Sequence, residues 1–116
     1  MSSERKAVLE ACKRQQGADL SYPFGPEPAV FKVAGKIFAI VGLERTPPQV
    51  TLKCDPEHGE LLRAQHAAIN PGYHMNKRHW ITVTLDGSLA PTMIEELIED
   101  SFDLVAPAKG PKTSKR

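Results

Sequence analysis

The side chains best suited to binding chemistry are concentrated in the ten residues Pro71–Trp80, PGYHMNKRHW. The segment combines two histidines, a lysine next to an arginine, an amide and two aromatic rings: Tyr73, His74, Asn76, Lys77, Arg78, His79 and Trp80. Such cations and amides contact phosphate oxygens, and such rings stack on bases or sugars. The same composition fits a solvated loop anchored to a sheet by its aromatic residues, because most charged runs are solvated surface. Both interpretations stay open on the residues alone.

Patterns for catalysis and metal binding are weak in the rest of the sequence. Cys54, His58, His74 and His79 are conceivable metal ligands, but they lack the close Cys-x-x-Cys or His-Glu-x-x-His spacing that fixes zinc geometry. There is no Gly-x-Ser-x-Gly elbow, and no group of glycines precedes a helix as a phosphate-cradling loop requires. We therefore predict a protein that is not an enzyme, with no catalytic residue, no metal and no cofactor.

The charge of the chain is nearly balanced, with 15 lysines and arginines against 14 aspartates and glutamates and a net charge of +1. Four of the cations lie in the last ten residues, where there is no acid: Lys109, Lys112, Lys115 and Arg116. Subtracting these four from +1 leaves −3 on residues 1–106. The balance excludes a strong global attraction for polyanions. A cationic surface on the folded part must therefore be local.

Length and composition predict one compact domain. The 116 residues are 41% hydrophobic and 25% charged, as is typical of globular proteins. We expect the domain to span residues 1–106. Residues 107–116 are expected to form a disordered basic tail, because they contain almost no apolar side chain.

Cysteine usage and hydropathy predict a cytoplasmic protein. Cys12 and Cys54 do not form a disulfide framework, so both are expected to be reduced and buried. There is no signal peptide, and the longest apolar run, Ile37–Leu43, is far short of the ~20 residues that cross a bilayer. We expect no contact with a membrane.

Capping residues and apolar spacing predict three helices, over Ser3–Gly17, Asp55–His66 and Pro91–Val105. Alternating apolar residues predict strands at Phe31–Val33, Lys36–Leu43, Gln49–Cys54 and Trp80–Leu85. The proline-rich segment Ser21–Pro28 is expected to be a stiff loop, and Asn70–Gly72 a turn. Tyr73–His79 fits either a short strand or a loop.

Short connections between the first three strands favour an antiparallel sheet with helices on one side. The predicted fold class is α+β, a two-layer sandwich in the order α-β-β-β-α-(β)-β-α. The open sheet face is expected to carry Lys32, Thr51, Lys53, Trp80, Thr82 and Thr84, with Phe38 and Ile40 as further candidates. Such a face can receive a nucleic-acid backbone or form a dimer interface, and the residues favour neither.

Six stretches spread over the chain carry a more specific pattern. They are Ser21–Gly25, Val33–Ala39, Leu52–Glu57, Pro71–Trp80, Leu85–Ser88 and Ser101–Val105. Together they closely resemble the MmcQ/YjbR-like family of small bacterial proteins. The resemblance implies a fold related to type III secretion chaperones, with strand ribbons likened to a double-wing DNA-binding motif. It also favours a second strand before Trp80, built from part of Tyr73–Lys77, and implies no catalytic residue set.

The leading hypothesis from the sequence is a bacterial DNA-binding protein with a local cationic and aromatic surface. The expected site comprises Lys77, Arg78, His74 and His79 at phosphates, Trp80 or Tyr73 for stacking, and Asn76 of the same segment. Lys36, Lys53 and the basic tail are expected to add electrostatic reach. The alternative is a protein-interaction or chaperone-like adaptor that dimerises through the open sheet face. With DNA as the partner, we expect a monomer or a weak homodimer.

Overall fold

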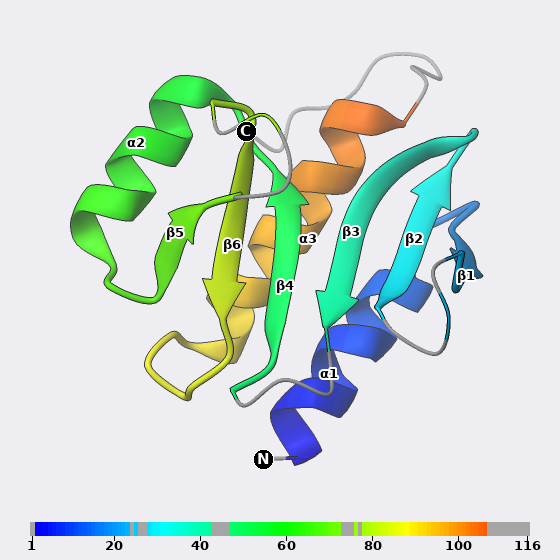
Figure 1. Ribbon diagram of the computed structural model, residues 1–116, viewed down its shortest axis with the longest axis horizontal. Coiled ribbons are helices and arrows are strands. Elements are labelled where there is room, and N and C mark those ends of the chain that lie inside the picture. Colours follow the sequence, from blue (N-terminus) through cyan, green and yellow to red (C-terminus); the bar gives the residue numbers. More distant parts are fainter. Residues whose placement is uncertain are drawn as a thin grey trace.

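The computed structural model describes residues 2–23, 25, 28–42, 47–72, 76 and 78–106. Within them the elements are α1 (Ser2–Lys13), β1 (Asp19–Ser21), β2 (Ala29–Val33), β3 (Lys36–Gly42), β4 (Gln49–Lys53), α2 (Pro56–Gln65), β5 (Ile69–Pro71), β6 (Trp80–Thr84) and α3 (Pro91–Val105). The strands form one antiparallel sheet in the order β1-β2-β3-β4-β6-β5. Figure 1 shows α1 and α3 behind this sheet, and α2 beside β5. The predicted α+β architecture is confirmed.

The described helix boundaries follow local chemistry. The carboxylate of Asp55 accepts a hydrogen bond from the backbone N–H of His58 at 3.5 Å, and Pro56 occupies the first turn of α2. This start is the one that the sequence predicts. α1 ends at Lys13, before the expected stop at Gly17, which lies in the following turn with a φ of +83°. Among the described residues, no helix has the length and apolar content needed to cross a membrane.

A hydrophobic core lies between the sheet and the helices. The inward side chains of the central strands, Val50, Leu52, Ile81 and Val83, are at most 1% exposed. They form one cluster with apolar residues from all three helices, among them Val8, Ala11, Leu62, Ile94, Leu97 and Ile98. Burying each large aliphatic side chain contributes roughly 1.5–3 kcal/mol relative to leaving it exposed. The helices therefore cover the inward face of the sheet, and the other face lies opposite them.

Two short edge strands differ from the sequence prediction. β1 pairs with β2 and includes Ser21, which was expected to begin a loop. β5 pairs with β6 and includes Asn70 and Pro71, which were expected in a turn. Proline is tolerated in an edge strand because its missing N–H has no ladder partner to lose. The strand expected within Tyr73–Lys77 falls on residues of which only Asn76 is described, and Asn76 is not part of a strand.

A β-bulge places Phe38 on the opposite face of the sheet from the one for which the sequence made it a candidate. The register between β2 and β3 shifts between Phe31 and Lys32, and Phe38 and Ala39 are both buried. The ring of Phe38 packs edge-on against Phe102 of α3, with centroids 5.3 Å apart. Phe38 therefore faces the helices and not the open side of the sheet.

Candidate functional site

The candidate site is the sheet face opposite α1 and α3, which we call the helix-free face. Residues directly opposite each other in an antiparallel sheet share a face. Lys53 of β4 is opposite Trp80 of β6, and Thr51 is opposite Thr82. The hydroxyl oxygens of the two threonines are 3.5 Å apart. Because the core residues of β4 and β6 alternate with these pairs, the pairs project away from the core.

Lys53 and Trp80 form the chemical centre of the helix-free face. The ammonium nitrogen of Lys53 lies over the indole ring, 5.9 Å from its centroid, which is a cation–π distance. Both side chains are half-buried. The backbone N–H of Gly72 donates to the carbonyl oxygen of Trp80 at 2.9 Å, and the backbone N–H of Lys53 donates to Ser101 Oγ at 2.8 Å. The backbone of Trp80 is therefore tied to the residue that follows β5, and the backbone of Lys53 is tied to α3.

A tight turn before β6 positions another cation of the predicted site. The side-chain oxygen of Asn76 accepts a hydrogen bond from the backbone N–H of Arg78 at 2.9 Å, as in an Asx turn. The backbone N–H of Cys54 donates to the carbonyl oxygen of His79 at 2.7 Å, which ties the turn to the end of β4. Arg78 is exposed and His79 is half-buried. Arg78 thus precedes Trp80 by two residues at the same end of β6.

The structure separates one predicted residue from this group. Lys36 is opposite Val33 at the β2–β3 hairpin, and Val33 belongs to the core. Because opposite residues share a face, Lys36 lies on the helix side at the end of the sheet and not beside Lys53. The bulge in β3 causes this difference, since it inverts the alternation that the sequence predicts. Three further predicted site residues, Tyr73, His74 and Lys77, lie outside the described residues.

Charge is distributed unequally between the two layers. α3 contains five acids and no base: Glu95, Glu96, Glu99, Asp100 and Asp103. The six strands contain three lysines, Lys32, Lys36 and Lys53, and one acid, Asp19. Because Lys36 lies on the helix side, Lys32 and Lys53 are the strand lysines on the helix-free face, and a polyanion is repelled by α3 and attracted toward these two.

The two cysteines are buried and form no disulfide. Burial raises the pKa of Cys12 to about 12. Burial, together with the carboxylates of Asp55 and Asp100, raises the pKa of Cys54 to about 11. His58 Nδ1 lies 3.9 Å from Cys54 Sγ, but a neutral thiol is a poor nucleophile and a poor metal ligand. Within the described ranges, no three His, Cys, Asp or Glu side chains are placed to share a metal ion.

Both thiols are expected to resist modification while the protein is folded. An ordinary cysteine ionises near pH 8.5, so at pH 8 Ellman's reagent should react at least about 100-fold more slowly with the native protein than with the protein in guanidinium. The pKa values of both thiols are higher in the folded protein than in the unfolded chain. The free energy of unfolding that the neutral thiols contribute is therefore fully present below about pH 8.5, and it is lost as the pH rises toward the pKa values of the folded protein. Rapid reaction of either thiol in the native protein would contradict the expectation.

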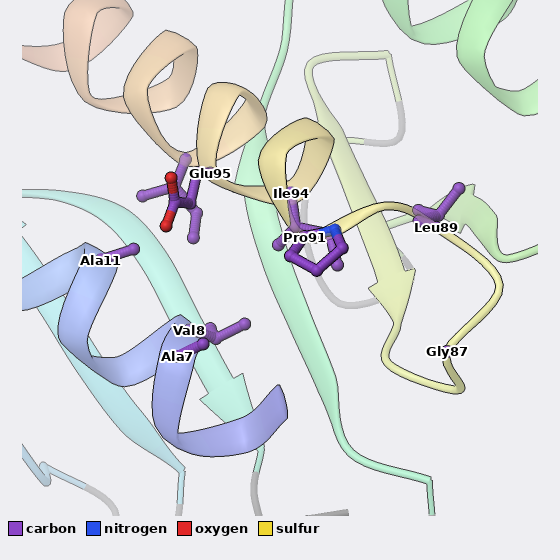
Figure 2. A pocket seen from close by; sticks show the side chains of 9 residues that line it. Ala7, Val8, Ala11, Gly87, Leu89, Pro91, Ile94 and Glu95 are labelled. Carbon is purple, nitrogen blue, oxygen red and sulfur yellow. The ribbon is translucent and has the colours of Figure 1, made fainter. Parts of the chain in front are cut away.

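A hollow between α1 and α3 is a second place where a ligand could be sought. Its volume is about 260 Å³, and Figure 2 shows Val8 and Ala11 of α1 on one side of it and Ile94 of α3 on the other. The one ionisable side chain among its described lining residues is Glu95, which forms an ion pair with Arg14 at 3.4 Å. The hollow is otherwise apolar and lies in the helix layer. It offers little polar chemistry, so the candidate site remains the helix-free face.

Two residues that shape the site escaped the sequence prediction. Ser101 of α3 is 0% exposed and binds the backbone of Lys53. Ser101 lies three residues after Ile98, within the apolar stripe of α3, so the helical spacing alone predicts that this polar side chain is buried. Gly72 packs so closely on β6 that a Cβ there would lie 2.7 Å from Cβ of Trp80. Nothing in the sequence indicates this approach, since it depends on how β5 pairs with β6.

Comparison with known proteins places the chain among relatives of similar size. YbdF of Escherichia coli O157:H7 is 41% identical over 98 residues, which cover 84% of this chain and 80% of YbdF. YjbR of Escherichia coli K12 is 40% identical over 95 residues, which cover 82% of this chain and 80% of YjbR. Both relatives are described as uncharacterised proteins.

Solved structures share the fold. The crystal structure of Deinococcus radiodurans protein DR2400, with a DUF419 domain, matches with a TM-score of 0.81 and 38% identity, over 91% of this chain and 80% of that one. A Pseudomonas syringae crystal structure matches with a TM-score of 0.75 and 34% identity, over 87% of this chain and 97% of that one. A family model described as YjbR matches residues 14–104. Because this match spans most of the sequence, the chain belongs to the YjbR family.

Proposed function

We propose that the chain is a non-catalytic DNA-binding protein whose binding surface is the helix-free face. The observation that supports the proposal is the Lys53–Trp80 pair, in which a cation and an aromatic ring meet on two central strands. An ammonium group binds phosphate oxygens, and an indole ring stacks on bases. Arg78 adds an exposed guanidinium near the same end of β6.

The charge distribution supports one orientation of DNA on the protein. The acids of α3 lie in the helix layer, on the other side of the sheet from Lys53. Residues 1–106 carry a net charge of −3, so the attraction is local and the affinity is modest. We expect a dissociation constant of roughly 1–100 μM at physiological salt, as for nonspecific electrostatic binding.

Neutralising Lys53 and Arg78, the described cations beside Trp80, tests the proposal. In the full chain, Lys53→Gln with Arg78→Gln should weaken binding of labelled DNA and reduce the slope of log affinity against log salt by about one per lost phosphate contact. The matched control is Lys6→Gln with Lys13→Gln, which removes the same charge from exposed positions of α1. Fluorescence anisotropy at several salt concentrations measures both quantities.

The control pair separates a local site from a general charge effect. Both variants keep the basic tail and have the same net charge, so a difference between them assigns binding to the helix-free face. An equal loss of DNA affinity in the two double variants would show that binding depends on net charge alone. An unchanged affinity and slope in Lys53→Gln with Arg78→Gln would refute the proposed site.

A protein-interaction role is the second candidate, and the edge of the sheet favours it. β1 is an edge strand whose outer side has no strand partner among the described residues. Leu20 within β1 and Tyr22 directly after it are 38% and 47% exposed. An unpaired edge with apolar side chains can pair with a strand of another chain. Light scattering tests self-association through this edge. A molar mass that rises with protein concentration in the wild type, and stays at the monomer value in Leu20→Lys, would support this role. A constant monomer mass in the wild type would argue against self-association.

A further inference from the structure

The geometry around Trp80 favours an unpaired base over a base inside a duplex, an inference that rests on the proposed function. Trp80 lies on β6, an interior strand of the six-stranded sheet, and its partner Lys53 lies on the adjacent β4. A base within a duplex has both ring faces stacked and cannot reach a ring set on a sheet. We propose that the helix-free face binds single-stranded DNA, with one base stacked on Trp80 and the adjacent phosphate bound by Lys53.

The Lys53–Trp80 contact is suited to exchange with a base. The Lys53 ammonium stands 5.9 Å from the centroid of the indole ring, at the far end of a stem that can rotate. Stacking of a base on an aromatic ring is stronger than a cation–π contact at an accessible site. A base therefore takes the place of the ammonium over the ring. The displaced ammonium then binds a neighbouring phosphate, so both partners keep a favourable contact.

Polar side chains beside Trp80 can bind the edge of a stacked base. Thr82 follows Trp80 on the same face of β6, with Thr51 opposite it on β4 and Asn70 opposite it on β5. Thr82 is itself buried, with 6% of its surface exposed, so the accessible polar groups are those of Thr51 and Asn70, which are half-buried. Adjacent strands lie about 4.8 Å apart. Hydroxyl and amide groups both donate and accept hydrogen bonds. An unpaired base exposes the donors and acceptors that such groups bind, whereas these atoms are paired in a duplex.

The arrangement of the helices argues against a duplex as the preferred ligand. Proteins commonly read duplex DNA by placing a helix or a two-stranded ribbon in the major groove. Here α1 and α3 pack on the opposite side of the sheet (Figure 1). β4 and β6 are flanked by β3 and β5, so they do not project as a ribbon. The surface around Trp80 is therefore a platform on which a single strand can lie.

The fluorescence of Trp80 reports stacking directly, because it is the only tryptophan in the chain. The full chain is titrated with a short oligodeoxythymidylate and, separately, with a self-complementary duplex of equal nucleotide count. We expect saturable quenching by the single strand, with an affinity at least about fivefold higher than for the duplex, which quenches little. This measurement uses the wild-type protein and does not depend on the folding of any variant.

Substitution of the ring separates stacking from charge. Trp80→Leu should lower the affinity for labelled oligodeoxythymidylate by about 5- to 100-fold, the range for loss of one stacked base, and Trp80→Phe should retain most of it. Tyr22→Leu is the control, since it removes an exposed aromatic ring at the far edge of the sheet. Circular dichroism confirms that each variant is folded.

The outcomes distinguish this inference from the function on which it rests. Quenching by the single strand, with an affinity that falls in Trp80→Leu and not in Tyr22→Leu, supports it. Equal binding of single strand and duplex without quenching would overturn the inference and leave DNA binding in place. If neither form binds, the proposed function fails as well.

Discussion

Ser101→Ala should lower the free energy of unfolding by about 2–4 kcal/mol, because it leaves two buried backbone groups unpaired and each such group costs roughly 1–3 kcal/mol. The hydroxyl of Ser101 donates to the carbonyl oxygen of Phe38 at 2.6 Å and accepts from the backbone N–H of Lys53 at 2.8 Å. It thereby joins β3 to β4 where their direct pairing, which includes Ala39↔Leu52, comes to an end. Alanine fits the space but forms neither hydrogen bond.

Urea unfolding followed by circular dichroism measures this loss. Ser88→Ala provides the matched control, since the hydroxyl of Ser88 donates to Asp86 at 2.7 Å on the exposed surface. Water replaces that bond when it is removed, so the midpoint of unfolding should hardly change. If Ser101→Ala unfolded at the same urea concentration as the wild type, the two backbone groups would have found other partners, and the bridging role of Ser101 would be wrong.

The longer elements of the fold could be predicted because each carries its own periodic signal. In α3, apolar residues recur at helical spacing from Ile94 to Val105, and in β4 burial alternates strictly between Gln49 and Lys53. β1 and β5 have three residues each, too few for a period to be recognised. Their existence depends on pairing with β2 and β6, which only the folded chain provides. The shortest strands are therefore the ones that periodicity does not predict.

The sequence predicts the types of residue in the candidate site better than it predicts which of them lie together on one face. Alternation along β4 and β6 suffices to place Lys53 and Trp80 on one face, and their contact follows from the register that sets them opposite each other. Phe38, a candidate for the open face, lies on the helix side because a bulge adds a residue to β3 and inverts the alternation toward Lys36, which therefore lies on the helix side as well. A bulge of this kind leaves no mark in the hydrophobic pattern. Predicting contacts between strands therefore requires the strand register as well as the alternation of apolar residues along each strand.

Gly72→Ala should destabilise the protein by roughly 1–3 kcal/mol, because the added methyl group overpacks the space between β5 and β6. A Cβ at Gly72 would lie 2.7 Å from Cβ and 3.2 Å from the carbonyl carbon of Trp80. The neighbour is strand backbone, which cannot rotate away as a long side chain can. Relief requires the strands to separate, and this weakens the 2.9 Å hydrogen bond from the Gly72 N–H to the Trp80 carbonyl oxygen.

Gly59→Ala, at the other buried glycine among the described residues, tests whether the loss of stability comes from the clash or from the loss of glycine itself. A Cβ at Gly59 meets the end of the long Arg63 side chain at 3.3 Å and Ile81 at 3.6 Å, contacts less severe than the 2.7 Å at Gly72. Alanine within a helix is favoured over glycine by about 1 kcal/mol. We therefore expect Gly59→Ala to match or exceed the wild type in urea unfolding, while Gly72→Ala falls below it and shifts the emission of Trp80. A Gly72→Ala protein as stable as the wild type, with unchanged Trp80 emission, would contradict this expectation. It would mean that the close packing of Gly72 against β6 does not fix the position of Trp80 on the helix-free face.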